Sequence, residues 1–265
     1  MMRSTSLPPI LRVALTSRRL LKVIAGLTNL DSVAVLKIAR SAAAGGADLV
    51  DIACEPALVR AVAEACPLLP ICVSAVDPEL FPAAVAAGAA MVEIGNFDAF
   101  YPQGRVFGAE EVLELTRRTR TLLPEVVLSV TVPHVLSLDQ QEQLAVDLVA
   151  AGADLIQTEG GTSARPFSAG SLGLIEKAAP TLAAAHAISR ALAAACPNPA
   201  PVLCASGLSA VTVPMALASG AAGVGVGSAV NRLSDELAMV AVVRGLREAI
   251  NAVAPATAVP QQRSL

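Results

Sequence analysis

A short motif recurs four times along the chain, and each copy leads from an Ala-rich stretch into an apolar run. The copies span residues 46–52, 88–94, 152–158 and 220–226, and each begins with glycine, as in Gly46-Ala47-Asp48-Leu49-Val50. A glycine at this point suits the left-handed backbone just past a helix end. An unbroken apolar run suits a strand buried on both faces of a parallel sheet. Each copy therefore predicts a junction from a helix into a strand.

Four more apolar runs lie between these copies and predict further strands. They are Lys22–Leu27, Pro70–Val76, Val126–Val132 and Pro201–Ser206. Eight strands that alternate with helical stretches over roughly 250 residues are typical of a (β/α)8 TIM barrel. A doubly wound open sheet is the alternative fold, but the segment after the first strand lacks the G-x-G-x-x-G motif that often marks it.

No composition shift divides the chain into two domains. We expect a single α/β domain, a (β/α)8 barrel over residues 21–254, preceded by a lead-in helix within residues 1–20 and followed by a polar tail at 255–265. An organelle transit peptide is the alternative interpretation of the Arg-containing first segment. A secretory signal is disfavoured because no long apolar core precedes a small-residue cleavage site.

The composition excludes several classes of function. With 54% hydrophobic and 15% charged residues the chain is not disordered, and a net charge of −3 offers no basic field for nucleic acid. No apolar run reaches the roughly 18 residues of a membrane span. The five Cys form no C-x-x-C pair, which suits reduced thiols, and the two His are far apart, so we expect no metal site.

The repeat also predicts which side chains face the barrel interior. Its copies are the even strands, and the interior layers of such barrels take side chains from alternate strands. The equivalent inward positions are Asp51, Glu93, Gln157 and Gly225, and the layer above holds Ala53, Gly95, Glu159 and Gly227. By the same argument the odd strands add Ser74, Ser129 and Thr131.

A structural barrel layer is normally built from Val, Ile or Leu, and two carboxylates in one layer are costly unless paired or solvated. We therefore take Asp51, Glu93 and Glu159 as candidate catalytic acids. A polar network that only sets strand register is the alternative. Lys22 could neutralise these acids or act as a Schiff-base lysine. A structural ion pair at the bottom rim is favoured for it, because it opens the predicted strand far from the catalytic face.

Other candidates follow the carboxyl ends of the strands. His134 is a candidate general acid or base, although a surface or capping role is as plausible. Two intervals between predicted strand starts are long: 37 residues from 89 to 126, and 48 from 153 to 201. The surplus is expected in the loops after strands 4 and 6, where barrel sites are built. The candidate substrate-binding residues are Asn29, Asn96, Gln157, Gly160, Gly161, Thr162 and Ser163.

Strands 7 and 8 end in small residues that suit an anion. Ser206 and Gly207 follow one strand, and Gly227 and Ser228 follow the next. Glycine lets backbone N–H groups approach an anion closely, and many barrels hold a phosphate at these two loops. We therefore expect a phosphate site there. The alternative is that these glycines only form tight turns.

Several segments resemble the hypothetical chloroplast reading frame twenty-three family, over about residues 20–235. They are Lys22–Leu27, Glu93–Asp98, Thr131–His134, Gln157–Ser163 and Glu176–Ala185. The family occurs in algal plastid genomes and in cyanobacteria, and has no established reaction or catalytic residues. The resemblance implies an aldolase-type barrel. It also implies a location in the cyanobacterial cytoplasm, or in the plastid stroma if the chain is algal.

Taken together, these features favour an enzyme or binder of a small phosphorylated metabolite. The chemistry expected is acid/base, of the isomerase, epimerase, aldolase or synthase class. A flavin-binding oxidoreductase barrel with FMN is one alternative, and a non-catalytic metabolite-binding or regulatory protein is another. No cofactor is required by the sequence, no nucleic-acid or membrane partner is expected, and a homo-oligomer is compatible with it.

Overall fold

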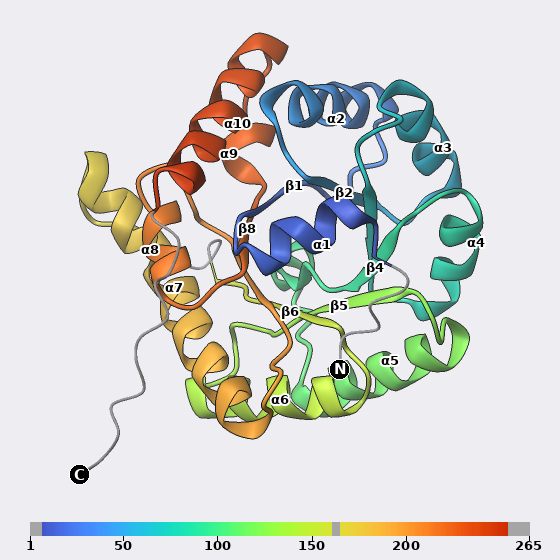
Figure 1. Cartoon of the computed structure of the whole chain (residues 1–265), viewed down its shortest axis with the longest axis vertical. Coiled ribbons are helices and arrows are strands. Elements are labelled where there is room, and N and C mark those ends of the chain that lie inside the picture. Colours follow the sequence, from blue (N-terminus) through green and yellow to red (C-terminus); the bar gives the residue numbers. More distant parts are fainter. Residues whose placement is uncertain (1–6, 161–164, 254–265) are drawn as a thin grey trace.

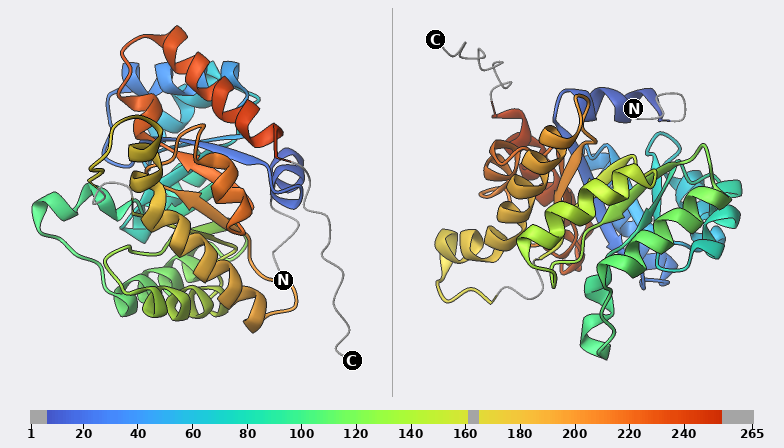
Figure 2. Two further views of the ribbon diagram at one scale, coloured as in Figure 1. Left: turned by 90° about the vertical axis from the view of Figure 1, so that its left-hand side faces the viewer. Right: turned by 90° about the horizontal axis from the view of Figure 1, so that it is seen from below.

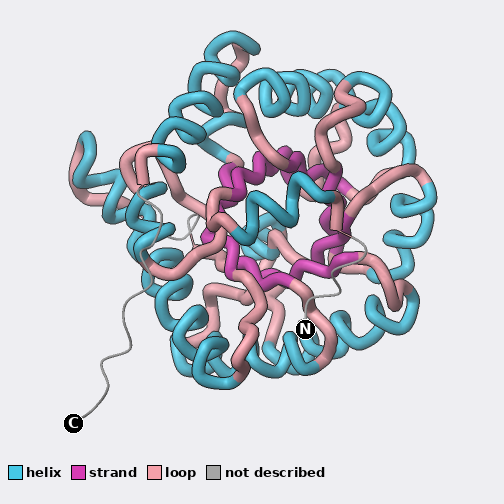
Figure 3. Tube along the Cα trace, in the orientation of Figure 1, coloured by secondary structure: helices cyan, strands magenta, loops and turns pink. Residues whose placement is uncertain are grey.

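Eight parallel strands close into a barrel in which each strand pairs with the next and β8 returns to β1 (Figures 1 and 3). The computed structural model describes residues 7–160 and 165–253. The strands are β1 (Leu20–Gly26), β2 (Leu49–Ala53), β3 (Ile71–Ala75), β4 (Met91–Ile94), β5 (Val127–Thr131), β6 (Leu155–Gln157), β7 (Val202–Ala205) and β8 (Gly223–Val226). The predicted TIM-barrel fold is thus confirmed.

Helices surround this ring of strands and cover its outer face (Figure 3). The helices of the described residues are α1 (Pro9–Thr16), α2 (Ser32–Gly45), α3 (Pro56–Ala65), α4 (Phe81–Ala86), α5 (Ala109–Leu122), α6 (Leu138–Ala150), α7 (Gly170–Ala195), α8 (Val213–Ala218), α9 (Ser228–Asn231) and α10 (Glu236–Asn251). Short 3-10 turns are η1 (Pro78–Leu80), η2 (Phe97–Ala99) and η3 (Tyr101–Gln103). Among the residues described, no helix combines the length and apolar character that crossing a membrane requires.

The repeated motif forms the helix-to-strand junctions that the sequence predicts. Its glycines, Gly46, Gly88, Gly152 and Gly220, all have positive φ, between 86° and 117°. In the copies before β2 and β6 the motif also carries an aspartate. Asp48 and Asp154 each accept a hydrogen bond from a backbone N–H of the preceding strand, at 2.8 and 3.0 Å, and each pairs with an arginine. These copies lie four strands apart, so the same aspartate contacts recur in the two halves of the barrel.

Helix α1 closes the amino-terminal end of the barrel. Leu11 is fully buried and packs with the first inward residues of the strands, among them Leu20, Leu49 and Met91. Figure 1 shows α1 lying across the ring of strands. The helix falls within the predicted lead-in segment, whose residues 1–6 lie outside the described ranges, as does the predicted tail at 255–265.

The long connections emerge from the opposite end of the barrel. In both views of Figure 2 the segment after β4, in green, and the start of α7, in yellow, extend away from the end that α1 covers. Turns η2 and η3 occupy the connection after β4. Part of the surplus expected in the loop after β6 instead belongs to α7, because that helix is 26 residues long. Sites in such barrels lie at the carboxyl ends of the strands, so a site is expected at the mouth on this end.

Candidate functional site

A fully buried polar layer crosses the barrel interior above the apolar floor. The Lys22 Nζ lies 2.6 Å from Glu93 Oε2 and 3.1 Å from Asp51 Oδ2, and donates to Gln157 Oε1 at 3.0 Å. All four side chains are at most 1% exposed. Because one ammonium contacts residues of β2, β4 and β6, the inward orientation predicted for Asp51, Glu93 and Gln157 is confirmed.

The interpretation of Lys22 as a bottom-rim ion pair is wrong. Strand β1 begins at Leu20, two residues earlier than the pattern indicates, so Lys22 lies one layer above the floor. The residue of β8 that pairs with Lys22 is Gly225. A Cβ atom on Gly225 would lie 3.0 Å from Ala205 Cβ and 3.4 Å from the Gln157 amide oxygen. Because Gly225 has no side chain, the layer has space there, and the long side chain of Lys22 extends across it.

Hydroxyl and amide groups saturate the two buried carboxylates. Ser74 donates to Asp51 at 2.6 Å, and Ser129 and Gln157 donate to Glu93 at 2.7 Å each. Such a network is needed because an unsatisfied charge in the interior is costly.

The charge state of the layer follows from this geometry. Burial lowers the pKa of Lys22, but the charges of Asp51 and Glu93 outweigh it and raise that pKa above its usual value. Burial raises the pKa of Glu93, although Lys22 opposes the shift. Lys22 is thus an ammonium engaged with three side chains, the arrangement of a counterion to the two carboxylates.

Asn96 connects this buried layer to the mouth of the barrel. Its Nδ2 donates to Asp51 Oδ2 at 3.2 Å, to Ser74 Oγ at 3.1 Å and to Glu93 Oε1 at 3.4 Å. The residue has left-handed backbone, with φ 59° and ψ 47°. It follows Gly95, where a Cβ atom would lie 2.1 Å from Thr131 Oγ1. The chain thus turns so that Asn96 reaches back over the polar layer.

A second cluster lies at the mouth, around Glu159. The Glu159 carboxylate accepts hydrogen bonds from Asp98 N–H at 2.9 Å and from the Tyr101 hydroxyl at 2.7 Å, and its Oε2 lies 3.0 Å from His134 Nδ1. Asp98 lies 3.6 Å from the same imidazole nitrogen and accepts a hydrogen bond from Ser206 at 3.3 Å. The structure therefore brings predicted Glu159 and His134 together with Asp98 and Tyr101.

The titration of this cluster is shifted by its own contacts. The hydrogen bond to Glu159 raises the pKa of His134, and the carboxylate charges add to the effect while burial opposes it. Burial raises the pKa of Tyr101, together with the charge of Glu159, so its hydroxyl stays protonated. Asp98, His134 and Glu159 also place one ligand atom each within 4.8 Å of one another, the spacing of a group that could hold a metal ion.

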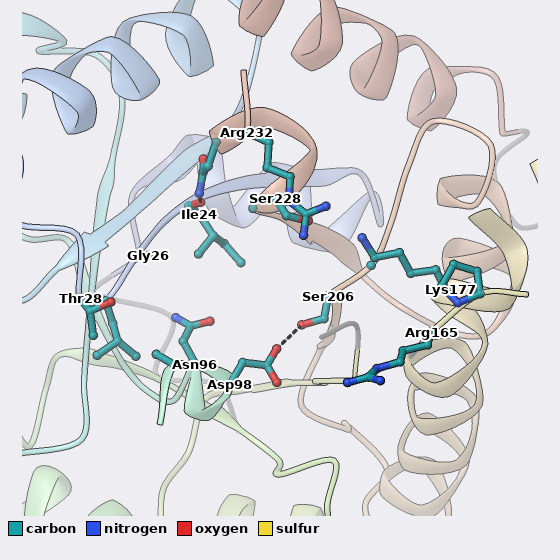
Figure 4. Close-up of a pocket in the computed structure, with 16 residues that line it drawn as sticks. Ile24, Gly26, Thr28, Asn96, Asp98, Arg165, Lys177, Ser206, Ser228 and Arg232 are labelled. Carbon is teal, nitrogen blue, oxygen red and sulfur yellow. Dashed lines mark hydrogen bonds between the residues drawn. The ribbon is translucent and has the colours of Figure 1, made fainter. Parts of the chain in front are cut away.

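A cavity of about 580 Å³ opens beside both clusters, at the carboxyl ends of β1, β4, β7 and β8. All four residues predicted to bind phosphate line it: Ser206, Gly207, Gly227 and Ser228. Asn96 and Asp98 line it as well. Figure 4 shows Asn96 and Asp98 on one side and the cationic side chains around the other, with Ser206 between Asp98 and Lys177.

Three cationic residues that are not among the predicted site residues line the same cavity: Arg165, Lys177 and Arg232. Burial lowers the pKa of Lys177, and the charge of Arg232 lowers it further, so two cations repel each other here. No carboxylate within the described ranges pairs with Lys177 or Arg232. Their positions after the carboxyl ends of β6 and β8 are the signal that could have identified them.

Some predicted site residues lie elsewhere. Asn29 does not line the cavity. Its side chain donates to Ala25 O and accepts from Asp31 N–H, each at 3.3 Å, and so holds the turn after β1. Gly160 packs against Pro180 of α7, which a Cβ atom would approach to 3.1 Å. Gly161, Thr162 and Ser163 lie outside the described residues. Burial raises the pKa of Cys54 to about 12, which suits an inert thiol.

Known structures share the fold at low sequence identity. A 3-hexulose-6-phosphate synthase aligns with a TM-score of 0.60 and 18% identity, covering 88% of this chain and 99% of that one. Thiamine phosphate pyrophosphorylase from Pyrococcus furiosus gives 0.56 and 16%, covering 89% and 98%. An (S)-3-O-geranylgeranylglyceryl phosphate synthase from Thermoplasma acidophilum gives 0.57 and 14%, covering 93% and 100%. These similarities concern the aldolase-type barrel alone.

Algal relatives are much closer in sequence. The "Uncharacterized protein ycf23" of Cyanophora paradoxa is 41% identical over 237 residues, covering 89% of this chain and 95% of the relative. That of Pyropia yezoensis is 35% identical over 235 residues, covering 89% and 84%. The model of the family described as "Protein of unknown function (DUF561)" matches residues 7–255. The chain therefore belongs to this family, to which the resemblance in its strand-end motifs also pointed.

Proposed function

We propose that the protein is an enzyme that binds a small phosphorylated metabolite in the cavity at the carboxyl end of the barrel and acts on it by acid/base chemistry. One observation carries the proposal: the glycine-containing ends of β7 and β8 share this cavity with three cationic side chains. A volume of about 580 Å³ suits a small ligand.

The phosphate is proposed to lie between the strand ends and the cations. Gly207, with φ 71°, and Gly227 leave backbone N–H groups open to close approach. Arg165 and Arg232 supply planar donors that match phosphate oxygens, and Lys177 supplies a point charge. An anion between Lys177 and Arg232 would also relieve their mutual repulsion.

Proton transfer is assigned to the cluster around Glu159. Within the described ranges, Asp98 is the one carboxylate that lines the cavity, so it is the group placed to exchange a proton with a ligand. His134 lies 3.6 Å behind it and is itself held by Glu159 at 3.0 Å. The raised pKa of His134 lets it carry a proton close to neutral pH. Such a carboxylate–imidazole arrangement suits enolisation, epimerisation or aldol chemistry.

The buried layer of Lys22, Asp51 and Glu93 has a positioning role in this proposal. None of the three side chains is more than 1% exposed, and Asn96 lies between them and the cavity. Asp51 and Glu93 hold Asn96, and the layer sets the charge beneath the reacting molecule without touching it.

The fold neighbours support the substrate class by analogy. Their names refer to a hexulose 6-phosphate, a thiamine phosphate and a geranylgeranylglyceryl phosphate. One fold hosts many chemistries, so this analogy raises the expectation of a phosphorylated ligand without naming a reaction. The flavin alternative gains no support from stacking rings, because no aromatic side chain in the described part of the chain lines the cavity.

Calorimetric titration with inorganic phosphate, followed by a panel of phosphorylated metabolites, tests the proposal. Lys177→Gln and Arg232→Gln should each weaken phosphate binding by about ten- to a hundredfold, the range of a hydrogen bond to a charged group. Arg60→Gln on the exposed side of α3 removes the same charge and should leave binding unchanged. Equal affinity in all three variants would refute the phosphate site.

Turnover is tested separately on any metabolite that binds. Asp98→Asn keeps the shape of the side chain but cannot accept the proton. It should therefore retain most of the affinity and lose turnover. Binding without turnover in the unaltered protein, across the whole panel, would instead establish a metabolite-binding protein.

A further inference from the structure

The orientation of the Asn96 carboxamide is fixed by its neighbours. Its three polar partners below are Asp51 Oδ2, Glu93 Oε1 and Ser74 Oγ. The two carboxylate oxygens accept only, and the Ser74 hydroxyl already donates its proton to Asp51 at 2.6 Å. None of the three atoms can donate to Asn96, so the part of the carboxamide that faces them must be the amide nitrogen. The amide oxygen must then point away from the buried layer.

That amide oxygen faces the cavity. Asn96 is half-buried and lines the cavity, and Figure 4 shows its oxygen directed into the open space beside Asp98 and Ser206. No described residue donates a hydrogen bond to Asn96 Oδ1. The oxygen is an acceptor whose direction is set before any ligand arrives.

The backbone makes this acceptor rigid. Asn96 has a left-handed conformation, which glycine and asparagine adopt more readily than other residues; outside glycine it is often found at functional sites. Gly95 before it packs against Thr131, and Phe97 after it is fully buried with its ring 4.5 Å from that of Phe107. The carboxamide is thus fixed from both sides of the chain and from below.

The cavity consequently has two chemically different walls. Arg165, Lys177 and Arg232 make one wall cationic, whereas Asn96 Oδ1 and the Asp98 carboxylate make the other a wall of acceptors. We propose that Asn96 Oδ1 is a specificity-determining acceptor for a hydroxyl or N–H group on the ligand. The ligand class would then be a phosphate ester whose carbon chain carries a donor group, such as a phosphorylated polyol. The inference rests on the proposed function.

Three probes separate the two walls: inorganic phosphate, n-propyl phosphate, and sn-glycerol 1-phosphate, which adds hydroxyl groups to the same chain. The unaltered protein should bind the glycerol ester about three- to tenfold more tightly than the propyl ester, the range of one hydrogen bond between neutral groups. In Asn96→Gly this preference should disappear while the affinity for inorganic phosphate stays the same. Glycine adopts the left-handed backbone without strain, so the chain trace should be kept.

Asn198→Gly is the matched control, because it makes the same substitution at an exposed position that does not line the cavity. It should keep the preference for the glycerol ester. The inference is overturned if the unaltered protein binds both esters equally, or if Asn96→Gly weakens all three probes in proportion. Failure of the protein to bind any of the three, inorganic phosphate included, would instead refute the proposed function itself.

Discussion

The ammonium of Lys22 has no contact with solvent, yet it is the one positive charge in a layer that holds two carboxylates. The sequence predicted the inward direction of Asp51 and Glu93, since the repeat places both at equivalent points on even strands. It also indicates Lys22 as a cation that could neutralise these acids, but the layer that Lys22 enters depends on where β1 begins. The pattern also could not identify Asn96 as the link to the cavity, because its left-handed backbone depends on the packing of Gly95 against Thr131.

Removing Lys22 should be far more damaging than neutralising either acid. Lys22→Met leaves two buried carboxylates without a cation and should lower the free energy of unfolding by about 3–5 kcal/mol. Asp51→Asn or Glu93→Gln leaves one carboxylate with one ammonium, so stability should be unchanged or raised. Urea unfolding of the three variants gives the comparison. A Lys22→Met protein as stable as its parent would contradict the role of Lys22 as a counterion.

His134 should make stability depend on pH. Its pKa in the folded protein is raised above the 6.5 of the free group, chiefly by the hydrogen bond to Glu159. The stabilisation from its protonated form is therefore fully present below about pH 6.5 and is lost as the pH rises through the raised folded value. Unfolding curves from pH 5 to 9 should show this loss, which His134→Gln should remove. An identical pH profile in that variant would count against the ion pair.

Among the elements, the strands were predicted well because glycine and an apolar run mark each even strand locally. Their ends were less exact: β1 starts at Leu20, since the apolar run continues before Lys22. The sequence did not predict that α1 closes the amino-terminal end of the barrel. Its short amphipathic pattern gives an apolar face but not the surface that this face covers. The sequence predicts a long loop after β6, whereas α7 takes up much of that length.

The plug formed by α1 predicts a large cost for one leucine. Leu11→Ala opens a cavity between α1 and the floor of the barrel, so it should destabilise the protein by about 2–5 kcal/mol. Ile10→Ala on the same helix changes a side chain that is 52% exposed and should cost no more than about 0.5 kcal/mol. Thermal and urea unfolding of both variants measure the difference. Similar stabilities would mean that α1 is not part of the barrel core.

At the scale of the whole molecule, barrel closure gathers groups that are far apart in the chain. Arg165, Lys177 and Arg232 line one cavity with residues from the ends of β4, β7 and β8. The sequence predicted the glycine-containing ends of β7 and β8, because that location follows from the barrel itself. It did not predict the three cations, because their side chains enter the cavity from outside the regular strand positions. The proposed function requires that the glycine-containing strand ends and the three cations bind the same ligand.

Gly227 offers the most direct test of a phosphate in this cavity. A Cβ atom at this position would lie 3.3 Å from Ile24 O, which is tight, so Gly227→Ala measures the effect of bulk alone. Gly227→Asp adds a negative charge at the same place. Native mass spectrometry and calorimetry with inorganic phosphate would compare both folded variants with the unaltered protein. Because Gly227→Ala already carries the effect of bulk, Gly227→Asp should bind phosphate at least about tenfold more weakly than Gly227→Ala, through charge repulsion. Equal phosphate affinity in Gly227→Asp and Gly227→Ala would contradict the account.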